Sequence, residues 1–274
     1  MRDGMSIKAK IRAIANKHKI PAQAVLQSYM FERLLERVSL SRFKDQVIIK
    51  GGLLIASLIG IEHRTTMDMD ATVKNFPLSE EAIWGLIREI CSIEVSDGVK
   101  FDVYAIESTR LDDEYGGFCV SLTATYDEIK VPLKIDITTD DAITPGAVIH
   151  QFSTLFDSRQ FELSAYNIET VLAEKYETIL RRGILNTRTR DFYDVYTLSA
   201  MQSFNPDILK KAILATAEKR SSTNFLPDKT LILQNIRSDT TMRQRWNLYC
   251  REYSYASGID FDTVMDVLEK LYNH

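Results

Sequence analysis

The 274-residue sequence has little of what marks several classes of protein. It contains only 3 cysteines, 6 prolines and 11 glycines, which excludes disulfide-rich and collagen-like chains. The cysteines lie far apart without a C-x-x-C pair, and the 4 histidines show no metal-ligand spacing. We therefore expect small core cysteines and no histidine-based or structural zinc site.

Long hydrophobic runs are also missing. The apolar stretches at 47–49 and 52–59 end at Lys50 and Gly60, far short of the roughly 20 residues that a membrane helix needs. Basic residues interrupt the N-terminal region before it forms the apolar segment of a secretion signal. We expect no membrane partner and a cytoplasmic location.

The charge of the chain is distributed unevenly. Residues 1–46 carry ten bases against four acids, residues 47–155 carry eight against eighteen, and residues 156–274 carry sixteen of each. This pattern is typical either of scattered solvated faces or of an acidic, cation-loaded centre with basic flanks.

Hydrophobic periodicity predicts helices first, then strands, then helices again. The first 45 residues are expected to be helical, and Ser79 is expected to cap a helix that reaches Cys91. The predicted strands are 47–50, 68–73, 100–108, 118–126 and 129–138. Because the pattern is helical from about residue 160, we expect an α+β fold with N-terminal helices and an α/β core in residues 1–157, followed by an all-helical domain in residues 158–274.

Asp68 and Asp70 form the first candidate site motif. The period of two in a strand places both carboxylates on one face. Two such carboxylates repel each other unless a cation lies between them, and Mg²⁺ prefers oxygen ligands. A D-x-D motif alone is weak evidence, since glycosyltransferases also use one.

Asp136 is the second candidate. It lies on the polar face of a half-buried strand in which Leu133, Ile135 and Ile137 occupy the apolar face. A third carboxylate on a strand beside the D-x-D strand would suit a site for two metal ions. Alternatively, Asp136 is an exposed residue paired with Lys130 or Lys134.

Lys50, Gly51 and Gly52 close a predicted strand and open a predicted helix. Glycine at this point lets the backbone approach a phosphate, and the first amides of a helix bind anions. A tight turn that requires a positive φ is an equally good interpretation.

Lys175 and Asp191 are the last candidates. Lys175 falls in an apolar-patterned helix, and Asp191 and Asp194 lie one turn apart, so that they face the same way. Without further context, Lys175 would be a solvated lysine and Asp191 a favourable charge at a helix N-terminus.

Taken together, these motifs resemble the AbiEii/AbiGii family of toxin nucleotidyltransferases, within the polymerase-beta-like nucleotidyltransferase superfamily. The similarity runs from about residue 31 to residue 198. Its most specific parts are 50–54, 64–70 and 174–175 with 190–196.

The resemblance implies a polymerase-beta-like nucleotidyltransferase domain and a set of site residues. It implies that Asp68, Asp70 and Asp136 hold Mg²⁺ or Mn²⁺. The implied catalytic set adds Lys175 and Asp191, and the implied nucleotide-binding residues are Lys50, Gly51, Gly52, Arg64, Thr66 and Lys175. Many members of the superfamily have Gly-Ser where this chain has Gly51-Gly52, so a hydroxyl contact to the phosphates is lost there unless Thr65 or Thr66 replaces it.

The resemblance also implies a function and partners. Members are toxins of two-gene toxin-antitoxin or abortive-infection (phage defence) systems with a winged-helix antitoxin, and several transfer nucleotides from a nucleoside triphosphate to the 3′ acceptor end of tRNA, which blocks translation. Two alternatives remain open. The acceptor could be a protein hydroxyl, or the chain could be a catalytically silent binding module.

An RNA acceptor requires a basic surface. Residues 205–251 carry nine bases against four acids, and Lys210, Lys211 and Lys219 are the candidate RNA-binding residues. Trp246, Tyr249, Tyr253 and Tyr255 either stack unpaired bases or belong to the core of the helical half.

Overall fold

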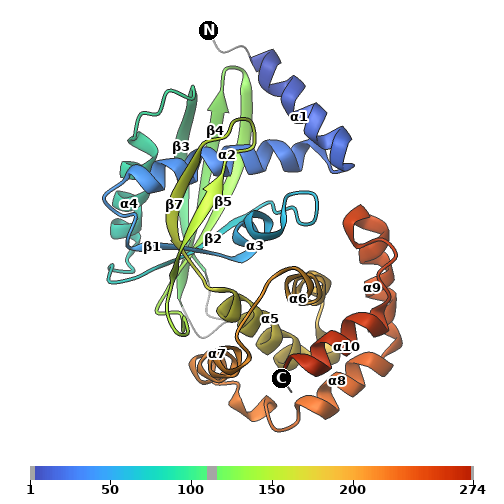
Figure 1. Ribbon diagram of the computed structural model, residues 1–274. Helices are drawn as coiled ribbons and strands as arrows, with labels where there is room; N and C mark the ends of the chain where they lie inside the picture. The colour runs from blue at the N-terminus through green and yellow to red at the C-terminus, as the bar shows by residue number, and fades with distance from the viewer. Residues whose placement is uncertain (1–3, 110–115, 273–274) are drawn as a thin grey trace. The chain divides into compact units, whose positions relative to one another are not determined.

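A computed structural model describes residues 4–109 and 116–272 (Figure 1). The chain divides into two compact units. The first consists of Met1–Asp140 and Val148–Ala165, and the second of Asp141–Ala147 and Tyr166–His274. The short segment Asp141–Ala147 thus belongs to the second unit, although it lies in the sequence between strands of the first.

The first unit contains a seven-stranded sheet in the order β3-β4-β5-β2-β1-β7-β6. The pairs β2–β5 and β1–β7 are parallel, and the other neighbours are antiparallel. The strands are β1 (Val47–Lys50), β2 (Met69–Val73), β3 (Val99–Thr109), β4 (Gly117–Tyr126), β5 (Ile129–Thr139), β6 (Val148–Ser153) and β7 (Gln160–Ala165). Sheet and helices together confirm the predicted α+β class.

Helices of the first unit are α1 (Gly4–His18), α2 (Ala22–Leu40), α3 (Gly51–Ile59) and α4 (Glu80–Ser92). The α4 helix begins as the sequence predicted, because the Ser79 side chain accepts a hydrogen bond from the Ala82 amide and two glutamates occupy the first turn. None of the helices in the described part of the chain has the length and apolar character needed to cross a membrane.

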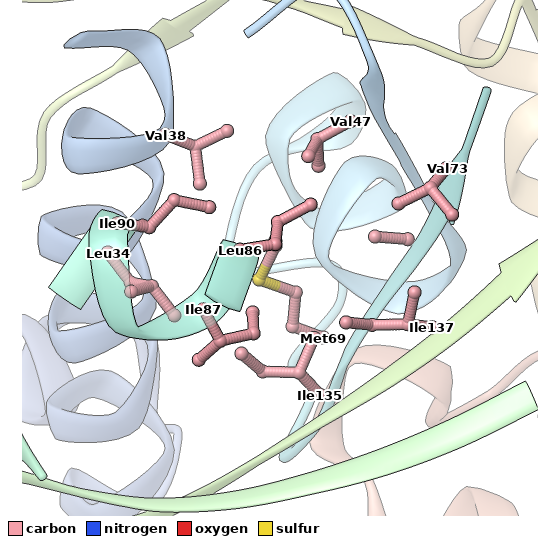
Figure 2. Close-up of a pocket in the computed structure, with 11 residues that line it drawn as sticks. Leu34, Val38, Val47, Met69, Val73, Leu86, Ile87, Ile90, Ile135 and Ile137 are labelled. Carbon is pink, nitrogen blue, oxygen red and sulfur yellow. The ribbon is translucent and has the colours of Figure 1, made fainter. Parts of the chain in front are cut away.

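Helices α2 and α4 bury their apolar faces against one face of the sheet. Figure 2 shows Leu34 and Val38 from α2 and Leu86, Ile87 and Ile90 from α4 gathered with apolar side chains of β1, β2 and β5. They enclose a cavity of about 20 Å³ lined only by apolar residues. On β2 and β5 it is lined by Met69, Ala71, Ile135 and Ile137, which alternate with the candidate aspartates, so the cavity belongs to the core and the aspartates lie on the opposite face.

Strand β7 corrects the prediction of helices alone from about residue 160, and β6 lies in a segment where no strand was predicted. The two strands form an antiparallel hairpin, and β7 pairs with β1 through Ile49 and Ala165. The sheet therefore continues to Ala165, past the boundary expected at residue 157. Hydrophobic alternation did not predict these two strands, because most of their side chains are exposed or half-buried.

The second unit is helical, with no strand in residues 166–272. Its helices are α5 (Ile168–Arg182), α6 (Thr189–Met201), α7 (Pro206–Lys219), α8 (Lys229–Ser238), α9 (Thr240–Glu252) and α10 (Phe261–Leu271), with short 3-10 turns η1 (Gly183–Leu185), η2 (Thr223–Phe225) and η3 (Ser254–Ala256). The side chains of Asn167, Asn205 and Asp260 cap α5, α7 and α10. Trp246 and Tyr249 are buried, so they belong to the core of this unit.

A partly buried ion network joins α5 to the end of α7, with Glu177 buried and Arg220 half-buried. Arg220 lies 2.7 Å from Glu177 and 2.9 Å from Glu174, and the Ser222 hydroxyl donates to Glu177 at 2.8 Å. Burial lowers the pKa of Arg220, but the two glutamates outweigh it and raise that pKa above its usual value. Each buried charge in this network therefore has an opposite partner.

Candidate active site

A row of three charged residues crosses three neighbouring strands of the sheet. In the strand register, Lys50 of β1 lies opposite Asp70 of β2, and Asp70 lies beside Asp136 of β5. Residues at matching positions on adjacent strands point to the same face of the sheet. Asp70 and Asp136 are both half-buried. The structure thus brings together two like charges that lie 66 residues apart in the sequence (136 − 70).

The backbone of Gly51 lies directly against Asp70. A Cβ atom at residue 51 would lie 1.9 Å from Asp70 Oδ2, and the φ of +66° is one that other residues rarely adopt. Position 51 therefore requires glycine for two independent reasons. Because α3 begins at this residue, its first amides lie at the edge of the carboxylate row, where they can bind an anion such as a phosphate.

Gly52 and Thr66 are packed as closely as Gly51 and Asp70. A Cβ atom at residue 52 would lie 2.5 Å from Thr66 Oγ1 and 3.2 Å from Arg64 Nη2. A serine at this position, as in many superfamily members, would collide with Thr66. The absence of the expected Gly-Ser pair therefore has a local steric reason.

Thr66 holds Asp68. Its buried hydroxyl donates to Asp68 Oδ1 at 2.6 Å, so it orients this exposed carboxylate just before β2 begins. Arg64, expected to bind nucleotide, is also buried, and it donates to the carbonyl oxygen of Thr65. In the described arrangement, Arg64 and Thr66 support the loop that carries the aspartates, and a direct role at the nucleotide stays a prediction.

The donor set suits a hard divalent cation in part. Asp70 and Asp136 offer carboxylate oxygens from adjacent strands, which is the chemistry that Mg²⁺ and Mn²⁺ prefer. Within residues 4–109 and 116–272, however, no three His, Cys, Asp or Glu side chains are grouped as metal ligands. Asp68, the third expected ligand, is instead engaged by Thr66, so two of the three expected ligands stand together.

Two neighbours of Asp136 are not among the site residues predicted from the sequence. Cys119 of β4 lies opposite Asp136, and burial together with this carboxylate raises the pKa of the Cys119 thiol to about 11. Thr138, two residues along the same face of β5, accepts a hydrogen bond of 2.8 Å from Lys50 Nζ. Period-two alternation could have indicated Thr138, whereas the register that brings Cys119 to Asp136 depends on hairpin geometry.

The second unit contains the other two expected catalytic residues, and they contact each other. Lys175 Nζ on α5 lies 2.6 Å from Asp191 Oδ1 and 3.1 Å from Asp194 Oδ2, both on α6. Arg188 pairs with the other oxygen of Asp191 at 3.0 Å. Lys175 is thus part of an ion cluster, and its contact with nucleotide phosphates stays a prediction.

The three candidate RNA-binding lysines all belong to α7. At about 100° per residue, the nine residues between Lys210 and Lys219 turn the helix by about 180° beyond whole turns. The two lysines therefore lie on opposite sides of α7, with Lys211 between them. They do not form one stripe.

Comparison with known proteins places this chain in a family. The family model described as nucleotidyl transferase AbiEii toxin, type IV TA system, matches residues 33–267. No match was found among curated proteins. The match extends through most of the second unit, well beyond the region up to residue 198 in which the resemblance was seen.

Two solved structures from Helicobacter pylori share the fold. One, described as JHP933, has a TM-score of 0.51 and 14% identity, with 92% of each chain covered. The other, described as a nucleotidyltransferase, has a TM-score of 0.52 and 14% identity, with 93% of this chain and 96% of that chain covered. At this identity the similarity shows the fold alone.

The family match defines an enzyme of nucleotidyl transfer. The chain belongs to the AbiEii nucleotidyl transferase toxin family of type IV toxin-antitoxin systems. Enzymes of this family generally use a nucleoside triphosphate and a divalent metal ion, and membership implies an antitoxin partner. The predicted family and reaction class are confirmed.

Proposed function

We propose that this protein is a metal-dependent toxin that transfers nucleotides from a nucleoside triphosphate to the 3′ acceptor end of tRNA and thereby blocks translation. The observation that carries the proposal is the position of Asp70 beside Asp136, with the Gly51 backbone packed against Asp70. Two half-exposed carboxylates next to a helix N-terminus provide a place for a cation and a place for a phosphate on one sheet face.

In this proposal Asp70 and Asp136, with Asp68 as the third ligand, would hold Mg²⁺ or Mn²⁺. The bound ion would lower the pKa of the acceptor hydroxyl and neutralise charge on the phosphates. The Gly51 and Gly52 amides bind the triphosphate, and Lys50 contributes positive charge at the edge of the row. The reaction then depends mainly on positioning, with the acceptor oxygen in line with the leaving pyrophosphate.

Lys175 and Asp191 have linked roles in the proposal. Lys175 binds nucleotide phosphates, and Asp191 and Asp194 orient its ammonium group, as their contacts of 2.6 Å and 3.1 Å support. Asp191→Asn is then expected to weaken nucleotide binding by raising KM more than it lowers kcat.

The RNA acceptor would bind along α7 through Lys210, Lys211 and Lys219. Because these lysines occupy different sides of the helix, they are best reversed one at a time, as Lys210→Glu, Lys211→Glu and Lys219→Glu. Reversal of a lysine that contacts phosphate should weaken RNA binding. It should also reduce the slope of log affinity against log salt concentration by about one. Unchanged affinity and slope in all three variants would exclude α7 as the RNA surface.

The direct test incubates the purified protein and Mg²⁺ with each α-labelled nucleoside triphosphate and total RNA, beside an Asp70→Ala control. Label in a tRNA-sized band, absent with Asp70→Ala, is the expected result and also names the nucleotide. Label on protein alone would favour a protein hydroxyl as the acceptor. Absence of label from both would favour a silent binding module.

The proposal extends to location and partner. Both substrates are found in the cytoplasm, where we place the protein. We also propose that the antitoxin is a winged-helix protein encoded alongside and that the pair acts in phage defence. Expression of the chain alone should arrest growth, Asp70→Ala should not, and co-expression of the neighbouring winged-helix gene should restore growth. Growth arrest that persists with that gene would exclude it as the antitoxin.

A further inference from the structure

A serine and a histidine outside the carboxylate row form a hydrogen-bonded pair. Ser57 Oγ, exposed on α3, lies 2.8 Å from Nε2 of His150 on β6. The two residues are 93 positions apart in the sequence, so the pairing is made by the fold. We propose that Ser57 is an acceptor hydroxyl for nucleotidyl transfer, so that one copy of the protein modifies another at this residue with His150 as the proton acceptor.

The histidine is held in place by its surroundings. Its ring packs edge-on against Phe152, with 4.6 Å between ring centroids, and Phe152 in turn stacks on Phe161. Burial lowers the pKa of His150, which favours the neutral imidazole. A neutral ring with its proton on Nδ1 leaves Nε2 free to accept the Ser57 proton, which is the arrangement of a nucleophile beside a general base.

The transfer step is balanced without any further reactant. Ser57 Oγ forms a bond to the α-phosphorus of a nucleoside triphosphate, and the bond from that phosphorus to the bridging oxygen breaks. Pyrophosphate leaves with the electron pair, and the Ser57 proton passes to His150 Nε2. The product is a nucleotide joined to Ser57 through a phosphodiester.

The position of Ser57 favours transfer between two copies. Gly51 and Ser57 lie six residues apart on one continuous helix, about 9 Å along its axis. The helix therefore holds the serine away from the phosphate-binding end of its own copy, whereas its exposure leaves it open to another. The proposal depends on nucleotidyl transfer, which family membership establishes, and not on RNA as an acceptor.

The test separates enzyme from acceptor by mixing two variants that differ in tag length. Ser57→Ala supplies an intact carboxylate row without the acceptor, and Asp70→Ala supplies the acceptor without an intact row. After incubation with the four nucleoside triphosphates and Mg²⁺, the Asp70→Ala chain should gain the mass of one nucleotide. Trypsin releases residues 51–64, in which Ser57 is the single hydroxyl-bearing side chain, so the modified peptide assigns the site.

Controls define the role of each member of the pair. Introducing His150→Ala into the acceptor chain should lower the initial rate of modification by about 100-fold, the typical contribution of a general base. Replacement of Ser257, an exposed serine far along the chain, should leave the modified peptide unchanged. RNA labelling by Ser57→Ala should equal that of the unchanged protein.

The outcomes distinguish this inference from the proposed function. Label on RNA without a mass gain on residues 51–64 would overturn the role of Ser57 and leave RNA transfer intact. A mass gain on that peptide without RNA labelling would support the role of Ser57 and overturn RNA as the acceptor. An undiminished rate in the His150→Ala acceptor would overturn the role of the histidine.

Discussion

Asp70 and Asp136 in the first unit place like charges on adjacent strands, whereas Glu174, Glu177 and Arg220 in the second unit place opposite charges in direct contact. Like charges on neighbouring strands destabilise a fold. Removing one partner of a buried ion pair also destabilises it strongly, because the other charge is left uncompensated. We therefore expect the first pair of charges to serve the proposed chemistry and the second set to stabilise the fold. Mutations in the two regions should therefore change activity and stability in opposite proportion.

The largest effect is expected from Asp136→Asn. Loss of this proposed metal ligand should lower the rate of transfer by about 10³-fold, corresponding to several kcal/mol of transition-state stabilisation. The free energy of unfolding should stay the same or rise by less than about 1 kcal/mol, because one of two like charges is removed. Steady-state transfer assays and urea denaturation measure the two quantities, with Asp102→Asn on exposed β3 as the matched control.

Glu177→Ala should show the reverse pattern. Its removal leaves Arg220 with less compensation in a largely buried site and should lower the free energy of unfolding by about 3 kcal/mol. Transfer per folded molecule should change little. Arg42→Ala, which breaks an exposed pair with Glu89, is the control and should change stability by less than about 1 kcal/mol. If both variants lost a similar free energy of unfolding, burial would not explain why one ion pair stabilises the fold more than the other.

The stability contribution of the buried Glu32 is expected to depend on pH. Burial raises its pKa from the ordinary 4.5 to about 7, although Arg33 opposes the shift. Since the folded-state pKa lies above the unfolded one, the stabilising contribution is complete below about pH 4.5 and is lost as pH rises through about 7. The stability of the protein relative to Glu32→Gln should fall by up to about 3 kcal/mol over this range. Urea denaturation of both proteins from pH 4.5 to 8 measures how the stability difference changes with pH. The exposed Glu128→Gln variant should show no such change relative to the unchanged protein.

A smaller loss of stability than that of Glu177→Ala is expected at Gly51, which Gly85 allows to be compared with an unhindered glycine. Gly51→Ala should lower the free energy of unfolding by about 1–2 kcal/mol, because of its positive φ and the collision with Asp70, and should also reduce transfer. Gly85→Ala on α4 meets no atom within 4 Å and should raise stability by up to about 1 kcal/mol. Thermal denaturation compares the two, and equal signs would contradict the steric argument at residue 51.

Much of the first unit followed from the sequence because its signals are local. Alternation located β5, and the Ser79 cap located α4. The β6–β7 hairpin did not follow, since its mostly exposed side chains give no alternation. In the candidate site, too, contacts that depend on the tertiary structure could not be predicted from the sequence. Asp136 was found by its place in a strand, but the engagement of Asp68 by Thr66 and the pairing of Cys119 with Asp136 required coordinates.

The helical half shows the same division. The side-chain caps at Asn167 and Asp260 were readable because a cap lies within three residues of the amides it serves. The partners of Arg220 lie 43 and 46 residues away, and the sequence offered only a basic residue that counted toward an RNA surface. Its ion pairs with Glu174 and Glu177 indicate a structural role for this half-buried arginine instead.

The path of the chain between the two units limits how the protein can be dissected. Residues 141–147 belong to the helical unit, and the carbonyl oxygens of Thr144 and Gly146 accept hydrogen bonds from the Asn167 side chain that caps α5. A fragment that starts at residue 166 would therefore lack the partners of its first helix, and a fragment that ends at residue 140 would lack β6 and β7. A single proteolytic cut cannot divide the chain into two complete units, so each unit depends on the other for the continuity of its own backbone.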